Sequence, residues 1–275
     1  MIIDSHQHFW QVGRFDYPWL TPELGILYRD YLPEDLEPIL KQNKVTQTVL
    51  VQASNSLEEA KWLLRLADEN EFIAGVVGWV DLKSSVINDQ LDEFLQHKKF
   101  KGVRHLVESE PMDDWLVQPE VLAGLAVLEA RDVPYDLLVH PRHLKFVPQI
   151  VESCPKLRMV IDHLAKPPIA SVAIDDWRKE FASLAKFPTL SCKLSGLVTE
   201  ANHDTWAIDD LRPFVLVALE TFGPDRLIFG SDHPVCLLAG SYERVLQSFE
   251  TLLADLSPEM KERVFSSNAR EFYRL

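Results

Sequence analysis

The chain has 275 residues, 47% of them hydrophobic and 25% charged, which is enough to bury an ordinary globular core without disulfides. Its formal net charge of −14 disfavours binding to nucleic acid or to anionic lipid, because both require a cationic surface. We therefore expect neither a nucleic-acid partner nor a membrane partner.

The cysteines and the first residues bear on location. Cys154, Cys192 and Cys236 are widely spaced and form no CxxC pair, which favours reduced thiols. No apolar run reaches the length of a membrane span. Asp4 and His6 interrupt the start of the chain, where the apolar part of a signal peptide would lie. These features predict a cytoplasmic protein.

Eight short apolar runs follow one another along the chain, and several are rich in β-branched residues. Nearly continuous runs of this kind are typical of strands that are covered on both faces. We therefore predict eight strands, within residues 2–9, 46–54, 72–82, 101–107, 135–141, 158–165, 189–197 and 225–235.

Most gaps between these runs have a helical pattern. Ser56, with Glu59 three residues later, forms a capping-box pattern, and Ser241 is a second candidate cap. Two longer insertions, 11–31 and 108–118, are rich in Trp, Pro and acidic residues. Apolar residues recur at helical spacing in five stripes: Leu57, Ala60, Leu64 and Ala67; Val121, Leu125 and Leu128; Leu144, Val147 and Val151; Phe181, Leu184 and Phe187; Val245, Phe249 and Leu252.

Strands that alternate with helices over about 250 residues are typical of a (β/α)8 barrel. An open doubly wound sheet is the alternative, but no GxGxxG loop follows the first run, which weakens a dinucleotide-binding version. We predict an α/β protein with a single domain, a (β/α)8 TIM barrel over residues 1–275. Its surface helices give no clear oligomer signal, so a homo-oligomer is left open.

Polar residues gather at the carboxyl ends of the predicted strands, where the active site of a TIM barrel lies. Histidine is costly to bury without a partner, so five strands that end this way point to one shared site. His97 and His203 lie in polar segments and are assigned no function, and His143 lies at the rim or begins the next helix. The strand-end residues are His6 and His8; Arg104 and His105; His140; Asp162 and His163; and Ser231, Asp232 and His233.

A metal ion is one use for this set. Residues i and i+2 of a strand point to the same side, so His6 and His8 can face one ligand. With His140 and Asp232 they form a nitrogen-and-oxygen set that suits Zn²⁺. The guanidinium of Arg104 opposes a second cation nearby. We expect one divalent metal, zinc, or none.

The strings "DSHQHFW", "KGVRH", "VIDHLAKP", "KLSGL" and "FGSDHPV", in this order, resemble the lactonase branch of the amidohydrolase superfamily over essentially the whole chain. The resemblance implies a (β/α)8 barrel that hydrolyses a small lactone. Asp232 matches the catalytic aspartate, His6 and His8 the first-strand pair, and His140 the fifth-strand histidine. Some members of this branch work without a divalent metal. His233 is a departure, because tryptophan is usual there, and it is expected to touch substrate or change metal affinity.

Lactone hydrolysis requires a polarised carbonyl, a deprotonated water and a reprotonated leaving alkoxide. We assign water activation to Asp232, which then gives the proton to the ring oxygen. His6, His8 and His140 are expected to stabilise the oxyanion, directly or through one Zn²⁺, with Arg104 as a second cationic donor.

A sugar lactone presents several hydroxyls and one apolar ring face. Trp10 and Trp79 can supply a flat wall for that face, although each also fits an ordinary core. A dicarboxylate lactone would need several cations, and only Arg104 and Arg142 lie near the strand ends, which favours neutral lactones such as L-fuconolactone or L-rhamnonolactone. Further candidates for substrate contact are His105, Arg142, His163, Lys166, Ser195 and His233.

Three other functions remain as alternatives. A metal-dependent decarboxylase of an aromatic acid would share the paired histidines and the eighth-strand aspartate. A hydrolase of a dicarboxylate lactone would share the whole barrel. A binding protein without chemistry is disfavoured by the intact set of Asp232 and histidines.

Overall fold

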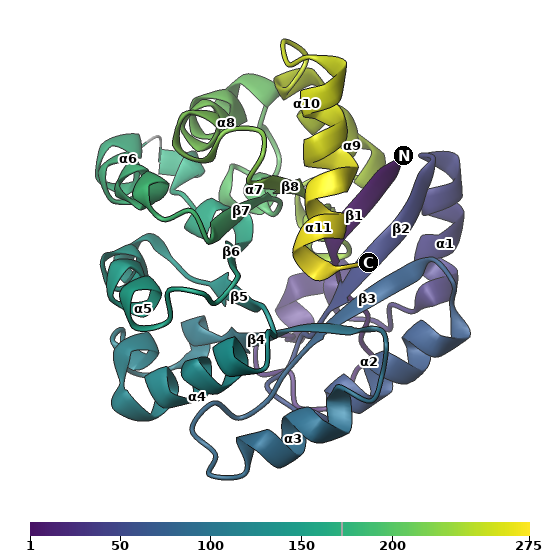
Figure 1. Cartoon of the computed structure of the whole chain (residues 1–275). Coiled ribbons are helices and arrows are strands. Elements are labelled where there is room, and N and C mark those ends of the chain that lie inside the picture. Colours follow the sequence, from purple (N-terminus) through teal and green to yellow (C-terminus); the bar gives the residue numbers. More distant parts are fainter. Residues whose placement is uncertain (172) are drawn as a thin grey trace.

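Eight parallel strands form one sheet in the order β1 to β8, so each strand lies beside its neighbours in the chain (Figure 1). The structure is a computed structural model that describes residues 1–171 and 173–275. It confirms the predicted (β/α)8 barrel and all eight predicted strands. Their bounds are β1 Ile2–Gln7, β2 Val45–Val51, β3 Ile73–Gly78, β4 Phe100–Leu106, β5 Tyr135–Leu138, β6 Met159–Ile161, β7 Leu190–Leu194 and β8 Leu227–Phe229.

Helices surround the strands, and both predicted caps are confirmed. Ser56 accepts a hydrogen bond from the backbone N–H of Glu59 at 3.2 Å, and Ser241 accepts one from that of Arg244 at 3.1 Å. The helices are α1 Pro33–Gln42, α2 Leu57–Glu69, α3 Ile87–Phe94, α4 Pro119–Ala130, α5 Val147–Ser153, α6 Ile174–Ala182, α7 Leu197–Glu200, α8 Ile208–Phe222, α9 Tyr242–Leu252, α10 Pro258–Glu262 and α11 Asn268–Tyr273.

The barrel closes between β1 and the segment that follows β8. Gln7 and His233 form a parallel bridge there. The backbone N–H of Asp232 donates to the carbonyl of His6 at 2.8 Å, and that of His8 donates to the carbonyl of His233 at 2.7 Å. This closure brings the predicted histidine pair and the predicted aspartate together, although more than 220 residues separate them in the chain.

A small apolar cluster joins the strands of the barrel to the last helix. Side chains from β1, β2, β3, β6 and β8 pack there against Phe272 and Tyr273 of α11. Helix α11 lies next to β1 in Figure 1, so the last helix of the chain packs against its first strand. Residues near the C-terminus therefore form part of the apolar packing of the barrel. Over the described residues, no helix is both long and apolar enough to cross a membrane.

Candidate active site

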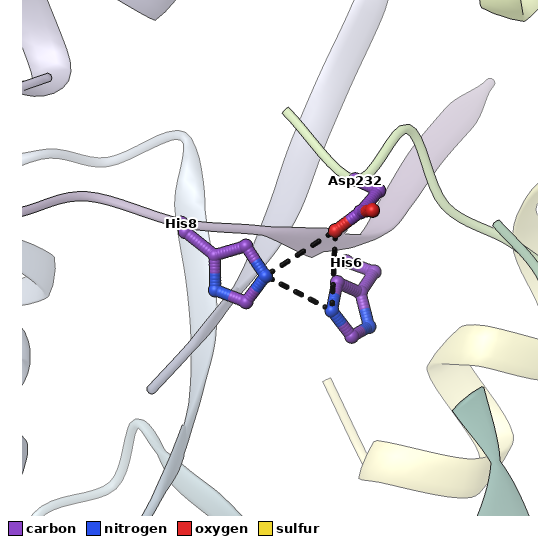
Figure 2. A group of neighbouring side chains, drawn as sticks. All are labelled: His6, His8 and Asp232. Atoms are coloured by element: carbon purple, nitrogen blue, oxygen red, sulfur yellow. Dashed lines mark hydrogen bonds and ion pairs between the residues drawn. The ribbon is translucent and has the colours of Figure 1, made fainter. Parts of the chain in front are cut away.

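Three side chains from opposite ends of the chain meet at the carboxyl end of the barrel (Figure 2). His6 Nε2 lies 3.1 Å from His8 Nε2. Asp232 Oδ1 lies 3.7 Å from the first nitrogen and 3.4 Å from the second. None of the three residues is more than 4% exposed. The prediction that His6, His8 and Asp232 share one site thus agrees with their placement.

The protonation of this trio follows from its surroundings. His8 Nδ1 lies 2.8 Å from the carbonyl oxygen of Val51, so Nδ1 carries the proton and Nε2 presents a lone pair to Asp232. Burial lowers the pKa of both His6 and His8, which keeps their rings neutral near pH 7. Burial alone would raise the pKa of Asp232, but His163, His8 and His6 hold it below its ordinary value. The trio is therefore two neutral imidazoles and one carboxylate.

These three atoms fit a metal ion. A tetrahedral Zn²⁺ with bonds of about 2.0–2.1 Å separates its ligand atoms by about 3.3 Å, and the three separations here range from 3.1 to 3.7 Å. Lone pairs packed this closely repel one another unless a cation or a proton lies between them. Asp162 Oδ1 lies 3.4 Å from His6 Nδ1 and 3.0 Å from Lys193 Nζ, so a carboxylate and an ammonium together support the side of the His6 ring that faces away from the trio.

Arg104 of β4 brings a fixed positive charge to the edge of the trio. Its Nη1 lies 3.2 Å from His6 Nε2 and 3.1 Å from Asp162 Oδ2. Its Nε and Nη2 donate to Gln52 Oε1 at 3.1 and 3.0 Å. Arg104 also lines the cavity described below, and these contacts fix its guanidinium there.

His163 stands beside the trio on the other side. Its Nε2 lies 4.0 Å from Asp232 Oδ1, and its Nδ1 lies 2.8 Å from Ser195 Oγ. Gly196 has a φ of +62°, and a Cβ at this position would lie 2.5 Å from His163 Nδ1, so only glycine leaves room for the ring. Burial lowers the pKa of His163, which keeps this third imidazole neutral.

A second polar layer lies directly beneath the trio. Lys193 Nζ contacts three side chains, at 3.1 Å from His6 Nδ1, 3.0 Å from Asp162 Oδ1 and 2.6 Å from Asp136 Oδ2. The hydroxyl of Tyr273 donates to Asp136 Oδ2 at 2.7 Å. These side chains come from β1, β5, β7, α11 and the residue that directly follows β6, so they link several strands of the barrel to the last helix.

A cavity of about 280 Å³ opens onto Asp232, which suits a small ligand. Trp19 forms part of its wall, with the indole fixed by a 2.8 Å hydrogen bond to the carbonyl of Ala53. Lys166 pairs with Glu108 at 2.5 Å. The lining combines apolar and charged residues: His8, Trp19, Leu24, Leu27, Ala53, Arg104, Leu106, Glu108, Leu138, His163, Lys166, Gly196, Thr199, Glu200, Asp232, Val235 and Leu238.

His140 is not part of the trio, although it was predicted as a metal ligand and oxyanion donor. Its Nε2 pairs with Glu108 Oε2 at 3.1 Å, and it lines an outer cavity of about 690 Å³. Within residues 1–171 and 173–275, the groups of ligand atoms close enough to share an ion are His6, His8 and Asp232, and His6, Asp162 and His163. His163, which follows β6, is therefore the third imidazole near Asp232, whereas His140 is not.

Two of the predicted substrate contacts line the cavity, His163 and Lys166, and a third, Ser195, acts on it through His163. Trp10 is fully buried against Trp19 and Tyr31, so it supports the wall that Trp19 forms. His233 is buried between Tyr31 and Tyr242 and does not line the cavity, so the expected contact with substrate is not seen there.

The other three predicted substrate contacts lie away from this cavity. Trp79 donates to His105 Nδ1 at 2.9 Å. The His105 ring stacks on Trp115 with centroids 4.0 Å apart, and its Nε2 pairs with Glu110 at 2.7 Å. Arg142 pairs with Asp113 on the surface, with 47% of its side chain exposed. His105 lies on β4, but its partners and Arg142 lie beyond the strands, where the strand-end pattern does not place side chains.

Sequence reasoning assigned no role to several residues of the site. Asp162 was recognised at a strand end but given no function, and Lys193 lies inside the recognised string "KLSGL". A lysine in the middle of a predicted strand is a signal for a buried ion pair, because it needs a partner. Trp19, Glu108 and Glu200 lie in loops or at a short helix, where periodicity gives no indication of direction.

Comparison with known proteins places the chain among relatives of similar length. It is 40% identical to an L-fucono-1,5-lactonase of Burkholderia ambifaria, over 99% of this chain and 95% of the relative. It is 38% identical to an L-fucono-1,5-lactonase of Burkholderia multivorans, over 99% of this chain and 96% of the relative.

A solved structure agrees equally well. It is the crystal structure of an amidohydrolase from Burkholderia multivorans with bound zinc, with a TM-score of 0.96 and 37% identity, covering 100% of this chain and 99% of that chain. The family model described as amidohydrolase matches residues 3–275. The chain therefore belongs to the amidohydrolase family.

Proposed function

We propose that this protein hydrolyses a neutral sugar 1,5-lactone, with L-fucono-1,5-lactone as the first candidate. The single observation that carries this proposal is the placement of Asp232 beside His6 and His8 at the floor of a small cavity. The names of the two relatives at 38–40% identity support the lactone class and do not favour a decarboxylase.

The substrate fits the cavity by size and charge. Trp19, Leu24 and Leu27 offer apolar surface to the sugar ring, while Glu108, Lys166 and Glu200 can bond its hydroxyls. The two lining cations are already compensated, Arg104 by Asp162 and Lys166 by Glu108. A dicarboxylate lactone would find no uncompensated cation among the described lining residues, so a neutral lactone is preferred.

Asp232 is the base in this account. Its low pKa keeps it ionised, and neutral His6, His8 and His163 surround it. The carboxylate takes a proton from water as the water oxygen attacks the lactone carbonyl. It then gives that proton to the ring oxygen as the C–O bond breaks, so the products are the open hydroxy acid and a carboxylate ready for another cycle.

Charge on the carbonyl oxygen is stabilised by groups that are fixed before the substrate arrives. Arg104 is held by Gln52 and Asp162, and its guanidinium is the cationic donor at the cavity. His163, oriented by Ser195, is the neutral donor or acceptor beside it. Preorganised donors of this kind contribute roughly 100-fold or more each in rate.

His6, His8 and Asp232 are the residues that would hold a divalent metal, and we propose Zn²⁺ because two imidazoles and one carboxylate suit it. When bound, the ion supplies Lewis-acid polarisation of the carbonyl and a more acidic water. Arg104, 3.2 Å from His6 Nε2, adds positive charge next to this position and so favours a single ion over a pair.

The location in the cytoplasm stays a prediction, supported by three buried cysteines that are unpaired in the part of the chain described here. The possible homo-oligomer also stays a prediction.

A panel assay tests the proposed function. The protein is mixed with L-fucono-1,5-lactone, L-rhamnono-lactone, 2-pyrone-4,6-dicarboxylate and an aromatic acid, and acid release is followed with a pH indicator. We expect acid release above the spontaneous rate from the two sugar lactones and not from the dicarboxylate. Loss of ultraviolet absorbance from the aromatic acid with CO₂ evolution would instead identify a decarboxylase.

A further inference from the structure

Lys193 lies near the carboxyl end of β7 with its side chain completely buried, and its ammonium contacts two residues beside the site, His6 and Asp162, and one farther from it, Asp136. It hydrogen bonds to Asp136 at 2.6 Å and to His6 Nδ1 at 3.1 Å, and it pairs with Asp162 at 3.0 Å. The ammonium therefore contacts the side of the His6 ring that faces away from Asp232. None of Lys193, Asp136 and Tyr273 lines the cavity described above.

Asp136 and Tyr273 hold Lys193 on the side that faces away from His6. Both residues are at most 1% exposed, and the Tyr273 hydroxyl donates to the same Asp136 oxygen that Lys193 contacts. Tyr273 belongs to α11 and packs in the apolar cluster that joins the strands to this helix. The chain of contacts from α11 to His6 therefore runs Tyr273, Asp136, Lys193, His6, with no step longer than 3.1 Å.

The free energy cost of burying charges argues against a purely stabilising role for the Lys193–Asp136 pair. A buried ion pair loses the hydration of both ions, and its replacement by packed apolar side chains is often neutral or stabilising. Two such pairs are buried here, Arg104 with Asp162 and Lys193 with Asp136, and Lys193 also contacts Asp162. What the buried charges do supply is direction, since a charged donor fixes the orientation of its acceptor.

We propose that Lys193, held by Asp136 and Tyr273, is a positioning residue that sets the ring orientation of His6 and so the geometry of His6 against His8 and Asp232. The inference rests on the proposed function for its kinetic test. It predicts that removal of the buried ion pair costs turnover without loss of the fold or of substrate binding.

The decisive variant carries Lys193→Met, Asp136→Leu and Tyr273→Phe together. It removes one positive and one negative charge, leaves the Arg104–Asp162 pair balanced, and replaces each side chain by an apolar one of similar shape. We expect a melting temperature equal to or above that of the wild type, a kcat at least about ten-fold lower, and a KM within about two-fold because the cavity wall is intact. An unchanged kcat in this folded variant would overturn the proposal.

Two further variants keep the test interpretable. Tyr273→Phe removes only the hydroxyl and keeps the ring, so it serves if the triple variant does not fold. We expect about a three-fold or larger fall in kcat with KM unchanged, and an unchanged kcat here would again overturn the proposal. Lys101→Met is the matched control, because Lys101 is on β4 and bonds the carbonyl of Arg274 outside the barrel. It should leave kcat unchanged.

A spectroscopic measurement separates this inference from the proposed function. The ring nitrogens of His6, assigned with a His6→Gln variant, are followed by nuclear magnetic resonance. We expect both His6 signals to shift or broaden in the triple variant, while those of His97 and His203 stay in place. Unchanged His6 signals would contradict a positioning role, even if the wild type hydrolyses no lactone in the panel and the proposed function fails.

Discussion

His8 donates its Nδ1–H to the carbonyl oxygen of Val51, 2.8 Å away, at the end of the neighbouring strand. This bond fixes the tautomer of the ring and leaves Nε2 unprotonated, 3.4 Å from Asp232 and 3.1 Å from His6. A backbone carbonyl behind an imidazole is the usual support for a metal-ligating histidine. His8 is therefore the member of the trio whose ring orientation is best defined.

Zinc binding should depend on His8. We expect the His8→Ala protein, measured by metal analysis after equilibration with Zn²⁺, to bind zinc at least about ten-fold more weakly than the wild type. His203→Ala is the control, because His203 lies in an exposed segment and bonds the carbonyl of Thr199. Equal zinc content in the His8→Ala and wild-type proteins would contradict the ligand assignment.

The third imidazole of the site is His163, and its replacement should cost more than that of His140. His163 lines the reaction cavity and is oriented by Ser195, whereas His140 pairs with Glu108 and lines the outer cavity. We expect His163→Asn to lower kcat/KM about 100-fold and His140→Asn to lower it less than about ten-fold. The two variants are compared on the same lactone, and the reverse order of effects would restore the sequence-based assignment.

The barrel and its trio could be predicted because their signals are regular. Apolar runs mark strands, and the carboxyl ends of parallel strands lie at one end of a barrel, which is why the sequence already indicates that His6, His8 and Asp232 lie near one another. His140 was misplaced because the pattern gives the end of the barrel but not the direction of a side chain beyond the strand. His140 and His163 each lie two residues beyond the end of their strand, at Leu138 and Ile161, yet only His163 reaches Asp232, so the loop conformation decides the direction of the ring.

The cavity wall was harder to predict, since it is built by insertions. Trp10 and Trp79 were chosen for their closeness to strands, yet Trp19 in the insertion 11–31 forms the wall. Its direction depends on a hydrogen bond to Ala53 and on packing against Trp10, which are contacts between distant segments. Contacts of this kind leave no periodic pattern in the sequence, so they could not be predicted from it.

Stability should fall as pH rises because of Glu59. This carboxyl is fully buried and accepts from the backbone N–H of Ser54 at 2.9 Å, which holds the loop after β2. Burial raises its pKa from 4.5 to about 8. The unfolded chain releases the proton near pH 4.5 and the folded protein only near pH 8, so the free energy of unfolding decreases between these values and is level above them.

The expected loss is about 5 kcal/mol across that window, of which about 3 kcal/mol falls between pH 5.5 and 8.5, where urea unfolding is measured. Glu59→Gln cannot ionise, so its stability should vary less over the same range. Glu58→Gln on the same helix is the control, because 72% of the Glu58 side chain is exposed. A wild-type curve that is flat over this window, or that Glu59→Gln leaves unchanged, would refute the assignment.

The turnover of an Asp232→Asn protein on L-fucono-1,5-lactone tests the central claim most directly. Asparagine keeps the size and leaves the cavity wall in place but cannot take a proton from water. We predict a fall in kcat of about 10²–10⁴-fold relative to the wild type, after subtraction of the spontaneous rate. An Asp232→Asn protein that turns over this lactone at close to the wild-type rate would show that the reaction does not depend on this carboxylate.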